Sequence, residues 1–436
     1  GEVVDAALAE PAKTDRQAGL AGAKADTITL LGGDPHADRL AAAAFEGFLH
    51  QRARERTLDG QRMGGRGADT VRAISGEAGI LASNHGSALF TRGDTQALVS
   101  CTLGEPRDAQ RIEGMHGQET RGFLLHYNFP PYSVGEARPS RGPGRREVGH
   151  GALARRALER VLPARQTFPY TIRVVSTITE SDGSSSMATV CGGTLAMMDA
   201  GVPLAAPVAG IAMGLVSDGS RAVVLSDICG AEDRLGDMDL KVAGTADGIS
   251  AIQMDNKLGS LSVELLRAAL GQATVGRRHI LAEMTSMRSA PRDGLAAGAP
   301  LTESIRVDPA KIGRLIGKGG ATIKELQRST RCRIDVNDDG LVVVMSRDPE
   351  AIAQALAQIA GFALELRVGG VYDGRVADVK EFGVFVSLGE HQGLVHRSEW
   401  SPDGTVQGVE PGASVRVRLL AINDKGQLVL SRRAAP

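Results

Sequence analysis

The sequence of 436 residues is poor in aromatic side chains, cysteine and net charge. Aromatic residues make up only 3% of it, against 55 glycines, so the core must rely on aliphatic packing and the fold on many turns. The four cysteines (Cys101, Cys191, Cys229 and Cys332) are scattered and form no CxxC pair. This argues against a zinc site or a disulfide framework and favours a reducing compartment. The net charge of -1 means that any basic surface is local and balanced elsewhere.

Long apolar runs are also lacking. The longest apolar stretch, AGVPLAAPVAGIAMGLV, contains Pro203 and Pro207 and is short for a membrane span, so we interpret it as a helix end, a loop and a buried strand. No signal peptide is visible, so we expect a cytoplasmic protein without a membrane partner. The chain starts with Gly1 and not with Met, from which we expect that an upstream portion is missing.

Changes in composition divide the chain into five segments, in keeping with roughly two to four domains for this length. Residues 1–68 are rich in Ala, Asp and Arg with few strand signals, which predicts a helical, partly irregular connector. Residues 69–290 alternate β-branched strands with amphipathic helices, which predicts one mixed α+β domain. Residues 291–304 are rich in Gly, Pro and Ala and predict a linker. Two smaller modules follow, at 305–365 and 366–433.

An acidic stretch, GAEDRLGDMDLKVAG, begins at Gly230 and contains Glu232, Asp233, Asp237, Asp239 and Lys241. If MDLKVAG forms a strand, alternation places Asp237, Asp239 and Lys241 on one face and the apolar residues between them in the core. Carboxylates this close raise each other's pKa unless a cation lies between them. The lysine partly meets that need, and Mg²⁺ or Mn²⁺, which favour hard oxygen ligands and few protein contacts, meets it better. The alternative is a solvated acidic turn before a strand.

Two further polar stretches belong chemically with the acidic one. GPGRREVGHGALARR places Arg145, Arg146 and His150 just ahead of a predicted helix, whose N-terminus favours anions. DGSSSMATV places Ser184–Ser186 where a loop enters a helix, so that hydroxyls and free backbone N–H groups form a phosphate cradle. The alternatives are a solvated turn for the arginines and simple N-capping by one serine. Together, the three stretches describe phosphoryl transfer better than any one of them does.

The first small module carries a glycine loop. In VDPAKIGRLIGKGGATIKELQRSTRCRIDV, the residues Gly317, Lys318, Gly319 and Gly320 lie between two predicted helices. Glycines there let the backbone approach a nucleic-acid phosphate chain closely, as in the GxxG loop of a KH domain. A plain helix–helix turn is the alternative, which the flanking IGRLI and IKELQ patterns disfavour.

The last module, GGVYDGRVADVKEFGVFVSLGEHQGLVHRSEWS, shows strands broken by glycines. Phe382, Phe385 and His396 fall on successive predicted strands in exposed-looking positions. This pattern predicts a small OB-fold barrel whose aromatic residues stack on bases, and the basic ending VRVRLL…SRRA favours RNA. The alternative is that the phenylalanines belong to the core.

Four long stretches of the large domain are distinctive: FTRGDTQALVSCTLG, LHYNFPPYSVGEARPSRGPGRREVGHGALARRAL, ITESDGSSSMATVCGGTLAMMDAGVPLAAPVAGIAMGL and LSDICGAEDRLGDMDLKVAGTADGISAIQMD. Together they resemble polynucleotide phosphorylase. The resemblance covers about residues 60–433 and matches the second RNase PH-like core of that family, followed by its KH and S-one type OB-fold modules. It therefore implies an α+β fold with an N-terminal helical segment, a KH domain and a small OB-fold β-barrel.

The resemblance also implies roles for particular residues. Asp233 and Asp239 would bind a catalytic divalent metal, Mg²⁺ or alternatively Mn²⁺, and Lys241 would assist the chemistry. The phosphate site would fall on Ser185 and Ser186, and the same pocket would be lined by Arg145, Arg146 and His150.

The activity implied is phosphorolytic 3′-to-5′ exoribonuclease activity in mRNA turnover, in which inorganic phosphate releases nucleoside diphosphates from RNA reversibly. The family also implies a homotrimeric ring and degradosome proteins as partners. Because the first core of the family is absent, the rival hypothesis is a non-catalytic RNA-binding subunit or an inactive fragment. The intact metal and phosphate residues argue against that rival. Hydrolysis by water is disfavoured because a hydrolase needs no phosphate cradle.

The sequence departs from the family pattern at a few positions. Ala231 stands where an aspartate is usual and Arg234 where a histidine is usual, which alters the surroundings of the metal site. Asn423 and Gln427 replace an acidic and a basic residue in the last module, which bears on its affinity for RNA. The arginine loops that the first core contributes to RNA binding are also absent.

Overall fold

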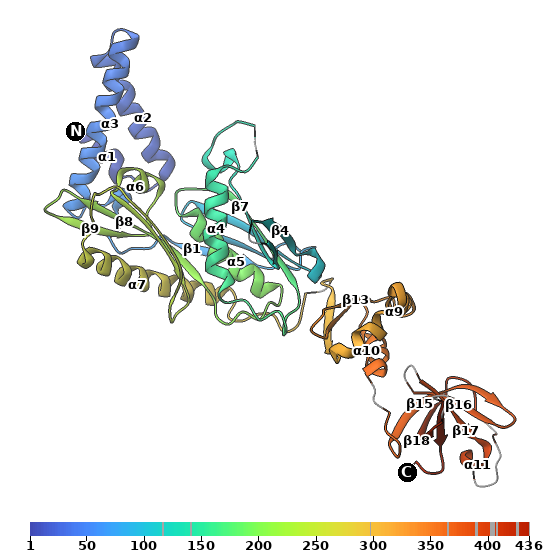
Figure 1. Ribbon diagram of the computed structural model, residues 1–436. Coiled ribbons are helices and arrows are strands. Elements are labelled where there is room, and N and C mark those ends of the chain that lie inside the picture. Colours follow the sequence, from blue (N-terminus) through green and yellow to red (C-terminus); the bar gives the residue numbers. More distant parts are fainter. Residues whose placement is uncertain are drawn as a thin grey trace. The chain divides into compact units, whose positions relative to one another are not determined.

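The computed structural model describes residues 1–115, 117–139, 142–296, 298–363, 366–388, 391–401, 406, 409–423 and 427–435. The chain divides into two compact units, Gly1–Ala299 and Pro300–Pro436, and each is described by itself (Figure 1). In the part of the chain described, no helix has both the length and the apolar character needed to cross a bilayer.

The first unit contains both helices and strands. Its helices are α1 (Glu2–Ala9), α2 (Lys13–Leu31), α3 (Pro35–Leu58), α4 (Arg145–Glu159), α5 (Ser185–Asp199), α6 (Gly230–Leu235) and α7 (Val263–Met287). Its strands are β1 (Ile74–Ala78), β2 (Gly86–Arg92), β3 (Thr95–Gly104), β4 (Gln110–Gly114), β5 (Gly117–Arg121), β6 (Phe123–Asn128), β7 (Thr171–Glu180), β8 (Ala209–Ser217), β9 (Ala222–Ser226), β10 (Met238–Gly244) and β11 (Ile249–Asn256).

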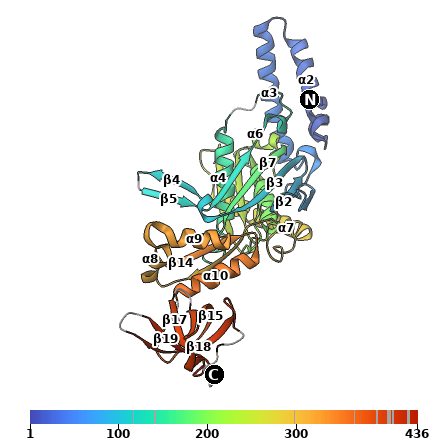
Figure 2. The same cartoon turned by 90° about the vertical axis from the view of Figure 1, so that its right-hand side faces the viewer.

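Helices α1 to α3 make up the N-terminal helical segment. The Asp34 side chain accepts hydrogen bonds from the backbone N–H groups of His36 and Ala37, which starts α3 immediately after α2. As a result, α2 and α3 lie side by side as a hairpin (Figures 1 and 2). Phe45 and Leu49 of α3 share an apolar cluster with Cys229, next to α6. The expected helical character is confirmed, and the segment packs on the rest of the unit.

Two sheets form the framework of the unit. One has the strand order β1-β2-β3-β7-β6, antiparallel except for the parallel pair β6–β7. The other has the order β11-β10-β8-β9 and is antiparallel throughout. Strands β4 and β5 form a separate hairpin.

Helix α5 lies in the centre of this unit and contacts β2 and β3 of one sheet and β8 of the other. Every residue of α5 is buried, which explains its nearly continuous apolar sequence. A Cβ atom at Gly192 would lie 2.7 Å from Cγ2 of Val99, and one at Gly193 would lie 2.9 Å from Cδ1 of Leu158. The close packing of α5 therefore depends on these two glycines.

Helix α4 begins earlier than the sequence pattern suggested. Arg145, Arg146 and His150 were expected just ahead of a helix, but α4 already starts at Arg145 and includes all three. The reason is Glu147, whose carboxylate accepts hydrogen bonds from the backbone N–H groups of Gly144 (2.6 Å) and Phe129 (3.1 Å). This carboxylate occupies the anion-attracting end of the helix.

The second unit begins with a three-stranded sheet of order β12-β14-β13. Its elements are β12 (Leu301–Arg306), α8 (Ile312–Ile316), α9 (Ala321–Thr330), β13 (Arg333–Val336), β14 (Leu341–Ser346) and α10 (Pro349–Ala363). Strand β12 starts within the predicted linker because Leu301 pairs with Ser346 in register with the rest of β14. Residues 364 and 365, where the first small module was expected to end, lie outside the described residues.

The last part of the chain is a closed barrel of order β15-β16-β17-β19-β18. Its elements are β15 (Val371–Lys380), β16 (Gly383–Leu388), β17 (His391–His396), α11 (Arg397–Trp400), β18 (Ser414–Ile422) and β19 (Leu428–Ser431). The pairing of β17 with β19 is parallel and the others are antiparallel. Five strands closed in this way are consistent with an OB fold, which confirms the expected fold class.

Candidate functional site

The first unit contains a cavity of about 540 Å³, lined by residues of α2, α4, α6, β10, β11 and the loop before α5. Of the residues proposed from the sequence, the cavity brings together Arg146, His150, Ser185, Ser186, Asp233, Asp239 and Lys241. Arg145 does not line it and instead faces a neighbouring hollow of about 390 Å³, which Arg146 also lines.

The carboxylates of the acidic stretch divide into two kinds. Glu232 is buried and pairs with Arg62 (Nε–Oε1 2.6 Å), and Asp237 pairs with Arg54 (Nη2–Oδ1 2.7 Å). Burial acts to raise the pKa of Glu232, but Arg62 and neighbouring Arg66 hold it below its ordinary value. These two carboxylates anchor the end of α3 and the chain after it, so they are structural and lie outside the lining of the cavity.

Asp239 and Lys241 share one face of β10, as the alternation predicted, and their side chains form an ion pair. Asp237 lies just before the strand and is not part of this group. Burial raises the pKa of Asp239; Lys241 opposes the shift, and Asp233 and Asp255 add to it. Asp239 Oδ1 is shielded from solvent and has no hydrogen-bond partner among the described residues.

A divalent cation would meet the electrostatic need of this group. Asp233 and Asp239 both line the cavity, and the buried, unpartnered oxygen of Asp239 suits a hard cation. In the described part of the chain, no set of three or more His, Cys, Asp or Glu side chains is arranged to hold a metal ion. A cation here would therefore need water or substrate oxygens to complete its shell, which is typical of Mg²⁺.

The serine loop lies across the cavity lining and turns sharply into α5. Gly183 (φ +81°) and Ser184 (φ +61°) both have left-handed backbone conformations. A Cβ at Gly183 would lie 2.6 Å from the backbone nitrogen of Gly230, so only glycine fits between the two loops. Ser185 Oγ lies 2.7 Å from the hydroxyl of Tyr127, whereas Ser186 Oγ is buried with no partner among the described residues. The backbone N–H groups of Met187 and Ala188 both donate to the carbonyl oxygen of Ser184 (3.1 Å), so the N–H groups that the start of α5 leaves without an intrahelical partner are those of Ser185 and Ser186.

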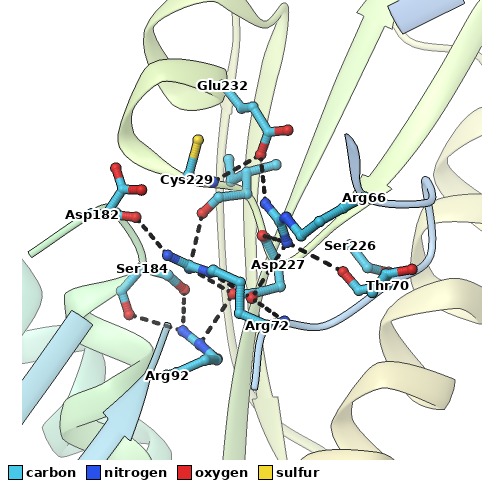
Figure 3. Close-up of polar contacts among 12 residues, drawn as sticks. Arg66, Thr70, Arg72, Arg92, Asp182, Ser184, Ser226, Asp227, Cys229 and Glu232 are labelled. Atoms are coloured by element: carbon cyan, nitrogen blue, oxygen red, sulfur yellow. Dashed lines mark hydrogen bonds and ion pairs between the residues drawn. The ribbon is translucent and has the colours of Figure 1, made fainter. Parts of the chain in front are cut away.

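Buried ion pairs and hydrogen bonds around Asp227 hold the serine loop in place (Figure 3). Asp227 accepts hydrogen bonds from Arg72 (Nε 2.8 Å) and pairs with Arg92 (Nε 3.0 Å). Arg92 then donates to Ser184 Oγ (2.5 Å), and Arg72 donates to the carbonyl oxygen of Asp182 (2.7 Å). Burial acts to raise the pKa of Asp227, but the two guanidinium groups hold it well below its usual range. Asp227 therefore stays ionised, and its contacts with the two arginines fix the loop.

Helix α4 presents Arg146 and His150 on one face, because they are four residues apart. The Arg146 guanidinium lies 4.6 Å from the centre of the Phe129 ring. Burial lowers the pKa of His150 to about 4, helped by the nearby positive charges of Lys241 and Arg146. His150 is therefore neutral at pH 7, and its Nδ1 has no partner in the part of the chain described.

The sequence patterns missed the contribution of the helical segment. Lys13 and Arg16 of α2 line the cavity: Lys13 Nζ donates to the carbonyl oxygen of Ser181 (2.8 Å), and Arg16 lies 3.6 Å from Asp182. Both therefore brace the start of the serine loop. Asp255, which faces Asp239 across the β10–β11 pair, was also missed. The helical prediction for residues 1–68 covered α2, but nothing in that stretch placed its polar residues at the site.

The glycine loop of the second unit lies between α8 and α9, as expected. Gly317, Gly319 and Gly320 have φ values of +72°, +62° and +78°, which other residues adopt only with strain. A Cβ at Gly317 would also lie 2.1 Å from Oγ1 of Thr322. Lys318 is exposed at the tip of this loop.

On the barrel, Phe382 is 49% exposed and packs edge-to-face against the half-buried Phe385, with ring centres 6.1 Å apart. Phe382 precedes β16 and is not on a strand, unlike the sequence expectation, because the chain turns there between β15 and β16. His396 is exposed at the end of β17, opposite Gly383 of β16. Phe382 and His396 therefore lie at the same end of the β16–β17 pair, and Phe385 packs against Phe382. Asn423 and Gln427 were expected to replace an acidic and a basic residue of the family pattern. Their side chains form a hydrogen bond of 2.9 Å with each other.

Comparisons with known proteins agree with this architecture. Residues 70–203 match the 3′ exoribonuclease family, domain 1; residues 302–361 match the KH domain, and residues 365–433 the S1 RNA binding domain. The polyribonucleotide nucleotidyltransferase of Myxococcus xanthus (strain DK1622) is 49% identical over 406 residues, which is 92% of this chain and 56% of that protein. That of Rhodospirillum rubrum is 50% identical over 416 residues, or 94% and 58% of the two chains.

The chain is similar to polyribonucleotide nucleotidyltransferases over most of its own length. The resemblance inferred from the sequence, to one RNase PH-type core followed by KH and S1 modules, is confirmed. The chain spans little more than half the length of these relatives. A solved structure, rice (Oryza sativa) Rrp46, aligns with 51% of this chain and 99% of its own at 18% identity and a TM-score of 0.42, which is too low to support an argument.

Two of the positions at which a departure from the family pattern is expected lie in the cavity itself. Ala231 and Arg234, both on α6, line the cavity beside Asp233. Ala231 packs on the apolar cluster of the N-terminal helices. Arg234 is exposed and adds a positive charge to the lining.

Proposed function

We propose that this chain is a phosphorolytic 3′-to-5′ exoribonuclease, that is, a polyribonucleotide nucleotidyltransferase that acts in mRNA turnover. Inorganic phosphate attacks the terminal phosphodiester of RNA, the bond to the 3′ oxygen of the preceding ribose breaks, and a nucleoside diphosphate leaves. The reverse reaction polymerises nucleoside diphosphates.

One observation carries this proposal. Ser186 Oγ, His150 Nδ1 and Asp239 Oδ1 are all shielded from solvent and have no hydrogen-bond partner among the described residues, and all three residues line the same cavity. Buried polar atoms are almost always paired, so three unpaired ones around a cavity indicate a polar ligand. A hydroxyl and an imidazole suit a phosphate, and the carboxylate suits a cation.

Each residue of the site has a role that follows from the chemistry of its side chain. Ser185, Ser186 and the start of α5 donate hydrogen bonds to the attacking phosphate, and Arg146 neutralises its charge. The neutral His150 can donate one further hydrogen bond to it. Lys241 supplies a positive charge beside the scissile phosphate and a proton for the departing 3′ oxygen. Arg145 acts from the neighbouring hollow, where it can contact the RNA backbone.

We propose Mg²⁺, or alternatively Mn²⁺, as the cofactor, held by Asp233 and Asp239. When bound, it would stabilise the negative charge that gathers on the scissile phosphate. Lys241 opposes the rise in the pKa of Asp239 that burial causes, through their ion pair.

RNA binding falls to the second unit in this proposal. The GxxG loop, Gly317–Gly320, would hold the RNA backbone, and Phe382, Phe385 and His396 would stack on bases. We further propose that the protein acts in the cytoplasm as a homotrimer that works with degradosome proteins. Exposed Ile252 and Met254 on the edge strand β11 support a subunit interface in the first unit.

The test is the shortening of labelled RNA by the purified chain with magnesium across a phosphate titration. We expect shortening to require phosphate and to yield nucleoside diphosphates. Ser186→Ala should raise the phosphate concentration needed, whereas Ser176→Ala, at a buried serine outside the cavity lining, should not. Shortening that is independent of phosphate and yields nucleoside monophosphates would contradict the proposal. RNA binding without any shortening would favour the non-catalytic subunit.

A further inference from the structure

A buried tyrosine lies directly behind the phosphate cradle. Tyr127 of β6 is 4% exposed, and its hydroxyl is hydrogen bonded to Ser185 Oγ at 2.7 Å. Tyr127 does not line the cavity, so it would not touch a bound phosphate itself. It contacts Ser185, which is one of the residues that would touch the phosphate.

The ring of Tyr127 contacts other parts of the same site. The His150 ring packs edge-on against it, with centroids 5.3 Å apart and planes at 69°. Phe129 stacks beside it at 6.2 Å with planes only 12° apart, and Phe129 carries the Arg146 guanidinium at 4.6 Å. One side chain therefore supports Ser185 and His150 directly and Arg146 through Phe129.

The backbone holds this tyrosine rigidly. Tyr127 pairs with Ser176 in the parallel β6–β7 ladder. Helix α4 passes over it at Gly151, where an added Cβ would already be in van der Waals contact with the Tyr127 Cβ at 3.5 Å. This close approach brings His150, the preceding residue of α4, against the ring.

We propose that Tyr127 is a positioning residue for phosphate: it donates its proton to Ser185 Oγ, so that Ser185 keeps its own proton for a phosphate oxygen. This inference rests on the proposed function of the cavity. A serine hydroxyl can donate only one hydrogen bond. When Ser185 Oγ accepts a hydrogen bond from Tyr127, its own proton points away from Tyr127 and is free to be donated elsewhere. Burial raises the pKa of Tyr127 above its usual value, which keeps the phenol protonated and able to donate at neutral pH.

The test is Tyr127→Phe, which removes one hydroxyl and keeps the ring contacts with His150 and Phe129. Loss of one hydrogen bond of ordinary strength should raise the KM for phosphate about 3- to 10-fold. We expect kcat to change less than about 2-fold, because the transferring group is not touched. The increase in melting temperature caused by phosphate alone should shrink by a matching amount, and RNA affinity should not change. Tyr170→Phe, at a tyrosine in the same core that does not line the cavity, is the control and should leave the phosphate KM as it is.

A double-mutant cycle separates positioning from simple support of the fold. If Tyr127 acts through Ser185, then Tyr127→Phe should cost nothing further in a Ser185→Ala background. Additive losses in phosphate KM, or an unchanged phosphate KM in Tyr127→Phe, would overturn the inference while leaving the proposed function in place. A wild-type chain that shows neither stabilisation by phosphate nor phosphorolysis would overturn both.

Discussion

Asp227→Asn is the sharpest test of how the serine loop is held. The substitution keeps the size of the side chain but removes the negative charge on which Arg72 and Arg92 converge. It also turns one acceptor oxygen into an amide that faces guanidinium donors. The Asp227 and Arg92 side chains are fully buried, and Arg72 is 9% exposed, so water cannot replace the lost charge.

The expected cost follows from that burial. Removing one partner of a buried ion pair typically destabilises a protein by about 3–5 kcal/mol, because the remaining charges are left uncompensated. For a unit of this size, we expect the melting temperature to fall by roughly 5–15 °C. Because Arg92 also holds Ser184 and Arg72 holds Asp182, phosphate binding should weaken even where the variant is folded.

The loss should depend on pH in a definite direction. The pKa of Asp227 in the folded protein is below its ordinary value, so its contribution to stability is present above the unfolded pKa of about 4 and is lost as the pH falls towards the folded value. The difference in unfolding free energy between wild type and Asp227→Asn should therefore be constant from pH 5 to 7 and shrink below about pH 4.

Urea denaturation followed by circular dichroism from pH 3 to pH 7 measures both the loss of unfolding free energy and its dependence on pH. The matched control is Asp59→Asn, at a carboxylate that is 60% exposed and paired with Arg221, which should cost less than about 1 kcal/mol. A loss below 1 kcal/mol in Asp227→Asn, or a loss that stays constant down to pH 3, would refute the reasoning.

Three further predictions concern the site and the second unit. Asp239→Asn should lower phosphorolysis by ~100-fold or more without unfolding the chain, and near-normal turnover at low magnesium would show that Asp239 does not hold the metal. A chain that ends at Ala299 should bind RNA more weakly and with a shallower salt dependence, yet keep its turnover at saturating RNA; loss of that turnover would make the second unit part of the active site. Burial, with Lys241 and Arg146 nearby, lowers the pKa of His150 to about 4. The folded state thus binds fewer protons than the unfolded state between that pH and about 6.5, so stability should rise with pH across this window. His150→Gln should flatten that rise in urea denaturation, and an unchanged pH dependence would count against a buried, neutral His150.

The acidic stretch illustrates what local pattern can and cannot predict. Two-residue periodicity was enough to place Asp239 and Lys241 on one face of a strand. It could not tell which carboxylates were free, because Glu232 and Asp237 find partners 170 and 183 residues away in the chain, at Arg62 and Arg54. Such pairing is set by the tertiary fold and leaves no trace in local spacing.

The phosphate side of the site shows the same division. The loop–helix junction at Ser184–Ser186 was predicted because serines after glycine are typical of a helix start. Arg145 and Arg146 looked equivalent in the sequence, but consecutive residues of a helix point about 100° apart, so only Arg146 lines the cavity. Lys13 and Arg16 were missed because the sequence of α2 does not reveal which part of the fold its polar residues face.

The most direct test of the central claim is to follow isotope from phosphate into product. The chain is incubated with RNA, magnesium and phosphate labelled with ¹⁸O, and the released nucleotides are analysed by mass spectrometry. Attack by phosphate held at Ser185, Ser186 and Arg146 predicts nucleoside diphosphates whose terminal phosphoryl group carries the label. Unlabelled nucleoside monophosphates would show that water attacks instead, and would contradict the account.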